Sequence, residues 1–115
     1  MTLDSVLIEN SEDLTVRGHG LYCDTCSVFV TNSTFRNLRS FYGPALYIIS
    51  SSSRNQYIET STFDNNTALG KAGAVGIKDA GVVHFRHNKF VSNTVSDDTQ
   101  PITDWRFCDS GAIHF

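Results

Sequence analysis

A short motif recurs three times at a nearly constant spacing, and this repeat constrains the fold more than any other feature of the chain. In each copy a β-branched or aromatic stretch leads through polar residues to a phenylalanine, and these phenylalanines, Phe35, Phe63 and Phe90, lie 28 and 27 residues apart. A second element, small residues before an apolar stretch, follows each copy at 43–48, 72–77 and 110–115, with a weaker copy at 18–23. A period of 27 to 30 residues built from short strands and polar turns is typical of a solenoid.

The strand pattern indicates which solenoid the repeat forms. Apolar runs such as 28–30 and 82–85 alternate with clusters of Ser, Asn, Asp and Gly. This pattern is typical of short strands separated by turns. A leucine-rich repeat would place Leu at several fixed positions, and a helical repeat would show a 3.6-residue period; the chain shows neither. We therefore predict an all-β fold, one parallel β-helix segment of about four coils, at roughly 1–27, 28–54, 55–81 and 82–115.

Alignment of the repeats predicts four columns of core side chains, each stacked on the equivalent residue of the next coil. The first two columns belong to the second element: Leu21, Leu46, Val75 and Ile113, then Cys23, Ile48, Ile77 and Phe115. The third and fourth belong to the first element: Val30, Ile58 and Phe85, then Phe35, Phe63 and Phe90. Equivalent side chains in adjoining coils would stack at about 4.8 Å.

The paired motifs resemble the polymorphic outer membrane protein repeat, which occurs on right-handed β-helices similar to pectin lyase. That repeat pairs a Phe-x-x-Asn element with a Gly-Gly-Ala-Ile-like element. Residues 63–66 and 90–93 match the first, and 73–75 and 111–113 match the second except for its leading Gly. The copy at 35–46 departs, with Leu38 in place of the Asn and Pro44 in place of the second Gly. The resemblance covers roughly residues 28–115 and implies a right-handed β-helix in an extracellular or cell-surface adhesion or fibre protein.

The length of the chain agrees with that implication. Four coils would rise only about 19 Å, and a solenoid needs capped ends because its terminal coils expose core and strand edges. Residues 112–115 stop inside a predicted strand without a cap. We therefore expect this chain to be part of a longer β-helix, held by a continuation of its own solenoid or by partner subunits.

Charge and hydropathy exclude two kinds of partner. The 9 Lys and Arg residues against 12 Asp and Glu give a net charge of −3, which is not the basic field of a nucleic-acid binder. Polar or charged residues interrupt every apolar run well before the roughly 18 residues that a membrane span needs. We expect neither nucleic-acid binding nor a transmembrane segment.

The three cysteines are candidate disulfide residues. Cys23 and Cys26 have the spacing of a redox or zinc half-motif, but no second ligand pair and no βαβ pattern accompany them. Cys23 falls in a core column and is interpreted as a buried small hydrophobe. Cys26 and Cys108 lie near turns, where an oxidising compartment would let one of them pair with a residue outside the chain. We expect no metal and no cofactor.

Two kinds of Asn stand out in the turns. Asn32 and Asn65 begin N-x-Ser/Thr sequons and are candidate glycosylation sites, although such triplets also arise by chance in Asn-, Ser- and Thr-rich coils. Asn66 and Asn93 each lie three residues after their Phe. We interpret this second pair as a structural amide ladder at a turn.

The last coil contains an insertion. The small residue of the second element lies 22 positions after the repeat Phe in this coil, against 10 and 11 in the two preceding coils. Residues 94–110 are therefore predicted to form a loop, and it holds Trp105, Arg106 and Phe107. These residues are candidate partner contacts, because insertions on solenoids map to one face and an exposed Trp beside an Arg is a frequent interface anchor. The alternative is that Trp105 and Phe107 fold back over the coil.

Catalysis is the remaining question. Polysaccharide lyases on β-helices combine carboxylates with an Arg or Lys base. An outward pair of His84 and Arg86 is predicted on one strand, but the residues aligned with Arg86 are Thr31 and Glu59, so no carboxylate column accompanies it. We interpret Glu59 and Arg86 as a cross-strand ion pair.

The sequence thus favours a non-enzymatic structural or adhesive β-helix module of a larger extracellular or cell-surface protein, filament or assembly. The alternative is a carbohydrate-active β-helix, either a polysaccharide lyase or a glycan-binding module. A stacked outward row of carboxylates with an Arg or Lys in adjoining coils would favour the second.

Overall fold

The computed structural model describes residues 2–17, 19–49, 55–71, 73–78, 82–95 and 113–114, and their regular structure is entirely β-strand. The first coil holds β1 (Thr2–Asp4), β2 (Leu7–Arg17) and β3 (Leu21–Asp24), and the second holds β4 (Phe29–Thr31), β5 (Thr34–Tyr42) and β6 (Leu46–Ile49). The third holds β7 (Asn55–Glu59), β8 (Thr62–Asp64), β9 (Thr67–Lys71) and β10 (Val75–Lys78). The fourth holds β11 (Val82–Arg86), β12 (Lys89–Val91), β13 (Thr94–Val95) and β14 (Ile113–His114).

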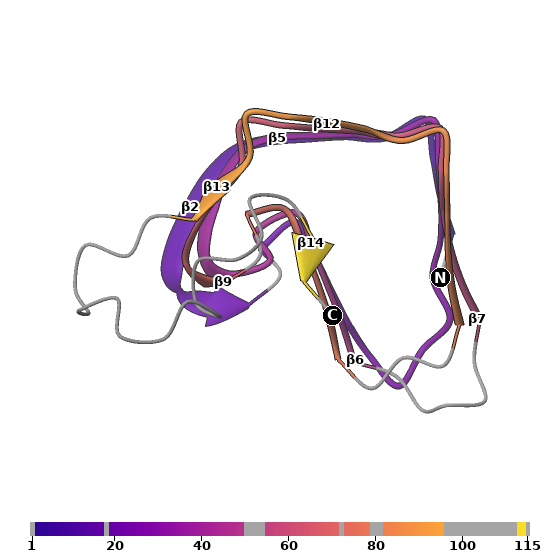
Figure 1. The fold of residues 1–115 in the computed structure, drawn as a ribbon, viewed down its shortest axis with the longest axis horizontal. Helices are drawn as coiled ribbons and strands as arrows, with labels where there is room; N and C mark the ends of the chain where they lie inside the picture. The colour runs from indigo at the N-terminus through magenta and orange to yellow at the C-terminus, as the bar shows by residue number, and fades with distance from the viewer. Residues whose placement is uncertain are drawn as a thin grey trace.

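These strands form three parallel sheets that run around a common interior. Sheet A is β1, β4, β7 and β11; sheet C is β3, β6, β10 and β14; sheet B takes the six remaining strands. All pairings between described strands are parallel. Figure 1 shows the coils superimposed, with the strands of each sheet lying one behind another. The chain makes three complete turns from β1 to β11, so the predicted all-β parallel solenoid is confirmed.

The core columns lie in register between coils. Leu46 pairs with Leu21 and Val75, and Val75 pairs with Ile113. The other described columns are Cys23–Ile48–Ile77, Leu3–Val30–Ile58–Phe85 and Ile8–Phe35–Phe63–Phe90. Leu3 and Ile8 extend the third and fourth columns into the first coil, whereas Phe115 lies outside the described residues.

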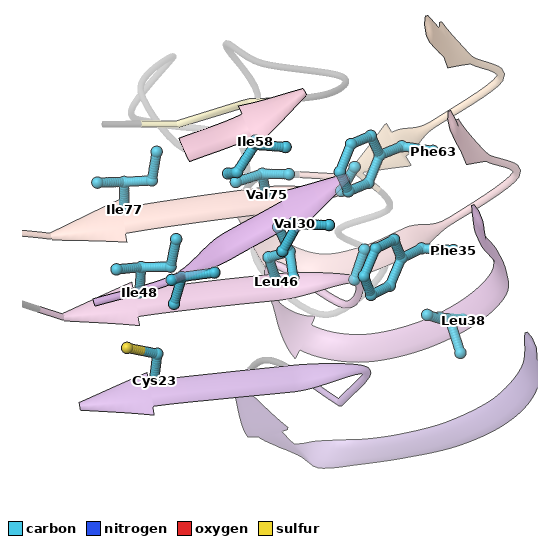
Figure 2. Close-up of a cluster of buried hydrophobic side chains, with 13 residues drawn as sticks. Cys23, Val30, Phe35, Leu38, Leu46, Ile48, Ile58, Phe63, Val75 and Ile77 are labelled. Carbon is cyan, nitrogen blue, oxygen red and sulfur yellow. The ribbon is translucent and has the colours of Figure 1, made fainter. Parts of the chain in front are cut away.

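The phenylalanine column shows how tightly the coils are stacked. The Phe63 ring lies parallel to Phe35 at a centroid distance of 5.2 Å and to Phe90 at 4.8 Å. Phe35 and Phe63 are fully buried, whereas Phe90 in the last coil is half-buried. Figure 2 shows the rings of Phe35 and Phe63 beside the aliphatic side chains of sheets A and C in one interior cluster. The middle coils therefore hold the best-buried part of the core.

The corners between sheets explain the abundance of Asn. Two equivalent positions recur from coil to coil with a positive φ of 50° to 58°, in the left-handed region. They are Ser5, Asn32, Thr60 and His87 at the corner between sheets A and B, and Asn10, Asn37, Asn65 and Ser92 at a second corner, which lies within sheet B. Asn tolerates this conformation better than most residues because its short polar side chain bonds locally. At the second corner the Nδ2 of Asn65 donates to Oδ1 of Asn37, and the Nδ2 of Asn37 donates in turn to Oδ1 of Asn10.

A buried amide ladder lies beside that corner, as predicted. The Nδ2 of Asn66 donates to Oδ1 of Asn93 at 2.9 Å and to the carbonyl of Phe35 at 3.0 Å. The Oδ1 of Asn66 accepts the backbone N–H of Leu38 at 3.1 Å. Leu38 departs from the motif at a place where β5 continues through the corner, whereas the third coil is broken there into β8 and β9.

Candidate functional site

The outward face of sheet A holds His84 and Arg86, the pair that the sequence analysis weighed as catalytic residues. The rings of Tyr57 and His84 are stacked at 4.5 Å with planes 5° apart, and Phe29 packs against Tyr57 at 5.7 Å in a tilted arrangement. Arg86 lies 3.9 Å from Glu59, which is the ion pair expected from the sequence. The aromatic rings stack along the solenoid, so the face of Tyr57 toward His84 is covered rather than offered to a ligand.

The carboxylates of this face do not form a row. The column that contains Arg86 runs Asp4, Thr31, Glu59 and Arg86, so its acids stand in alternate coils. Acids two coils apart are separated by about 10 Å, too far to share a small cation or a single reacting sugar carbon. Within the described ranges, no three His, Cys, Asp or Glu side chains gather in a way that could hold a metal ion.

Ion pairs also cross between coils on sheet B. Arg36 pairs with Glu9, and Arg39 pairs with Glu12 at 3.2 Å. All four side chains are at least 30% exposed, so each pair stabilises the fold by less than about 1 kcal/mol. These charged groups therefore hold neighbouring coils in register and do not surround a common ligand.

Two carboxylates of the first coil, Asp4 and Asp13, have pKa values below their ordinary value. The Asp4 carboxylate accepts hydrogen bonds from Thr31 Oγ1 at 2.8 Å and Asn32 Nδ2 at 3.3 Å, which lower its pKa. The Asp13 carboxylate accepts from the Thr15 hydroxyl at 2.7 Å and the Thr15 N–H at 3.0 Å, and its pKa is also lowered. Asp4 is therefore held in the ionised, accepting form by contacts from the second coil, and Asp13 by a contact within its own turn.

A Ser–His contact, which the sequence did not reveal, lies in the first coil. Ser11 Oγ and His19 Nε2 are hydrogen-bonded to each other. A nucleophilic dyad also needs an acid that orients the imidazole. The Oδ1 of Asp13 accepts its hydrogen bonds from Thr15. The charge of His19 lowers the pKa of Asp13, but less than these bonds do. Ser11 is the first-coil member of the column that contains Leu38 of the second coil. The Ser11–His19 contact therefore lies at the end of that column.

The structure pairs two of the three cysteines. Cys23 and Cys26 form a disulfide, with Cα atoms 5.9 Å apart. Both residues were candidate disulfide cysteines, but the expectation that Cys26 pairs with a residue outside the chain is wrong. Cys23 is buried in the expected column. The buried Gln56 holds the same corner, because its Nε2 donates to the carbonyl of Cys26 at 3.0 Å and its Oε1 accepts the N–H of Val28 at 2.6 Å. The disulfide and the amide together fasten the link from β3 to β4.

The outward face of sheet C carries a tyrosine cluster that the repeat alone did not indicate. Tyr47 is stacked on Tyr22 at 5.7 Å and meets Tyr42 edge-to-face at 4.9 Å. Tyr42 lies over Gly76, where an added Cβ would come within 2.6 Å of the Tyr42 Cδ1 atom. Position 76 therefore requires a glycine, because a side chain there would clash with the ring of Tyr42. In Figure 1 the outline of the coils folds inward between β9 and β6, and this brings the end of sheet B beside the start of sheet C.

The two sequon asparagines lie on the surface. Asn32 is exposed at a corner, and its Nδ2 donates to Asp4. Asn65 is exposed at the next corner and belongs to the outer Asn ladder with Asn37. The left-handed backbone at both positions gives each Asn a structural reason to be there, and their glycosylation stays a prediction.

Several candidate residues lie outside the part of the chain that the structure describes: Trp105, Arg106, Phe107 and Cys108. Their roles as partner contacts or as a disulfide residue stay predictions. In the described segments there is no helix long and apolar enough to cross a membrane. Comparison of the chain with protein-family models, with curated proteins and with solved structures finds no match in any of the three.

Proposed function

We propose that this chain is a non-enzymatic structural or adhesive module of a larger extracellular or cell-surface protein or assembly. The observation that carries the proposal is how the outward side chains are used. Arg36 bonds Glu9, Arg39 bonds Glu12, and Arg86 pairs with Glu59, each across one coil boundary. These charged groups contact the adjoining coil and do not gather at a common site, while the buried columns hold coil on coil, as a load-bearing or spacer element requires.

Three features support an extracellular setting. The Cys23–Cys26 disulfide is of a kind that persists in oxidising compartments. The sequons at Asn32 and Asn65 lie at exposed corners, where a glycan would project away from the core. The motif pairs also resemble the polymorphic outer membrane protein repeat of pectin-lyase-like β-helices, a likeness that implies a surface protein.

A carbohydrate-active role is the second candidate, and the outward set of Tyr57, His84 and Arg86 favours it. Aromatic and cationic side chains on a β-helix face are the chemistry that binds acidic sugars. Two observations stand against it: the rings stack on one another, and the acids of the same column occupy alternate coils. A glycan would have to bind along ring edges, without a paired carboxylate.

The two roles are separated by incubating the chain with neutral and acidic polysaccharides. Release of unsaturated or reducing ends reports catalysis, and calorimetric titration with oligosaccharides reports binding. The structural role predicts neither. Turnover or binding that is lost in His84→Ala and Arg86→Ala, and kept in the exposed control Lys78→Ala, would overturn it in favour of the carbohydrate-active role.

A positive test of the structural role is mechanical. The chain is placed between two folded reference domains and pulled along its length. Coils held by cross-coil columns should release one at a time, and each coil of about 27 residues should lengthen the chain by about 90 Å. Extension without measurable resistance would contradict a load-bearing or spacer role.

A further inference from the structure

The outward face of sheet A carries two columns of side chains that cross all four of its strands. One column contains the rings and the other contains the charges: Thr2, Phe29, Tyr57 and His84; then Asp4, Thr31, Glu59 and Arg86. Phe29 lies near the middle of this face, is 40% exposed and packs against Tyr57. A coil stacked before β1 or after β11 would cover the ends of the sheet and leave this face open, so its availability does not depend on the length of the solenoid.

The charged column has opposite charges at its two ends. Asp4 and Glu59 are its acids and Arg86 is its base, and the described strands of sheet A hold no other Asp, Glu, Lys or Arg. A two-fold rotation about a line parallel to the strands, through the middle of the face, exchanges β1 with β11 and β4 with β7. In two copies related in this way, Asp4 of each lies opposite Arg86 of the other. Glu59 lies opposite the neutral Thr31, so like charges do not meet.

The column of rings is self-complementary under the same rotation. Phe29 of each copy lies opposite Tyr57 of the other, so four rings gather at the centre with an acid–base pair at either end. A two-fold contact between identical chains has to be self-complementary in this sense, because residue i of one copy meets residue j of the other and the reverse. Aromatic side chains at the centre and charged groups at the rim are also the usual anatomy of a protein interface.

Both end groups of the charged column can bind a further partner. The Arg86 side chain is 67% exposed and lies 3.9 Å from Glu59, so its guanidinium has donors left for a second carboxylate. Asp4 is exposed, and hydrogen bonds from Thr31 and Asn32 lower its pKa and keep it ionised. Within the described residues the bonds to Asp4 all end on its Oδ1, which leaves Oδ2 to accept a donor from outside.

We propose that the outward face of sheet A is an interface between two copies of this chain, packed face to face with their solenoid axes antiparallel. Sheets packed in this way lie about 10 Å apart with their strands nearly aligned, a separation that Arg and aromatic side chains span. An acidic glycan is the other candidate occupant, but Asp4 and Glu59 would repel it along the column that holds Arg86. Coils that continue the solenoid would extend the two faces beyond these four strands.

Two exposed phenylalanines give a matched test of the central contact. Phe29 on sheet A is 40% exposed, and Phe41 on sheet B is 41% exposed. Phe29→Ser should weaken self-association at least about tenfold, because the two-fold axis removes the ring twice from each dimer. Phe41→Ser removes a ring of equal exposure away from the interface and should leave association within about twofold of the unchanged chain. Sedimentation velocity over a concentration series measures both, and melting curves show that each variant is folded.

Charge reversal tests the orientation of the two copies. Asp4→Arg and Arg86→Asp each turn two attractive pairs of the dimer into repulsive ones, and each should weaken association about five- to fiftyfold. The two substitutions in one chain should restore most of it, because the double variant again places opposite charges at the two ends of the column. Lys78→Asp, on sheet C, is the control for a change of charge away from the interface. Contact through another face predicts no loss in the single variants, and another orientation predicts no recovery in the double variant.

A chain that stays monomeric over the whole concentration series would overturn the interface, as would equal losses in Phe29→Ser and Phe41→Ser or no recovery in the double variant. A monomer that binds acidic oligosaccharides, and loses them in Phe29→Ser, would assign the face to a glycan instead. If Arg86→Asp does not fold beside Glu59, the two phenylalanine variants and Asp4→Arg decide the matter.

Pairing through sheet A is one form of the assembly proposed above and rests on that role, but the two fail separately. A monomeric chain that still resists pulling and leaves polysaccharides intact removes the pairing alone. Turnover of a polysaccharide removes the structural role, whatever the state of association.

Discussion

Replacement of Asn66 tests whether buried amides hold the coils together. The Asn66 side chain is fully buried, its Oδ1 accepts the N–H of Leu38, and its Nδ2 donates to the carbonyl of Phe35. Asn66→Ala leaves both backbone groups without these bonds, and each buried group left unsatisfied costs about 1–3 kcal/mol. We expect the free energy of unfolding to fall by about 3–5 kcal/mol, which is a large share of the roughly 5–15 kcal/mol that stabilises a domain.

Two further variants separate the hydrogen bonds from packing and from the turn. Asn66→Leu restores the volume and copies Leu38, the residue at this position in the preceding coil, yet it cannot bond the backbone of that coil. It should therefore remain destabilised by at least about 2 kcal/mol. Asn65→Gly removes the neighbouring exposed amide but keeps a residue suited to a φ of 55°, so it should cost under about 0.5 kcal/mol.

Urea unfolding followed by circular dichroism gives the three free energies. The expected order of stability is Asn65→Gly close to the unchanged chain, then Asn66→Leu, then Asn66→Ala. Asn66→Leu at or above the stability of the unchanged chain would refute the reasoning, because it would show that the column needs volume and not the amide.

Three other substitutions or treatments probe separate parts of the fold. Phe63→Ala opens a cavity in the middle of the ring column and should cost roughly 3–5 kcal/mol, whereas Asp64→Ala should cost under about 0.5 kcal/mol in the same urea titration; equal costs would show the register to be wrong. Reduction of the Cys23–Cys26 disulfide opens a short loop and should lower stability by about 2 kcal/mol, measured as a melting shift with reductant that is absent in Cys26→Ser. Gly43→Ala meets the carbonyl oxygen of Leu46 at 2.6 Å in a backbone with φ of 52°, so it should cost more than about 2 kcal/mol; a neutral result would mean that this turn differs from the one described.

The solenoid could be predicted from the sequence because its core positions repeat in kind. Phe63 stands 28 residues after one Phe and 27 before another, and a parallel stack is the simple way to bring such residues into one column. The same logic predicted the amide ladder of Asn66 and Asn93 and the cross-coil pair of Glu59 and Arg86. Each of these contacts joins equivalent places in adjoining coils, so the period alone defines it.

Contacts that do not follow the period could not be predicted in this way. The disulfide joins Cys23 to Cys26 within one coil, and it depends on the left-handed turn at Thr25, which no repeated residue marks. The packing of Tyr42 over Gly76 depends on the inward fold of the outline between sheets B and C. Only the path of the chain in space places such residues together.

The parallel register between coils is the central claim, and nuclear Overhauser contacts of Ile58 test it most directly. The side chain of Ile58 lies between Val30 of the preceding coil and Phe85 of the following one. The structure predicts methyl contacts from Ile58 to both, 28 residues before and 27 after it, with parallel cross-strand backbone contacts along β4, β7 and β11. Contacts of an antiparallel hairpin between 55–59 and 62–64, without the contacts to Val30 and Phe85, would contradict the solenoid.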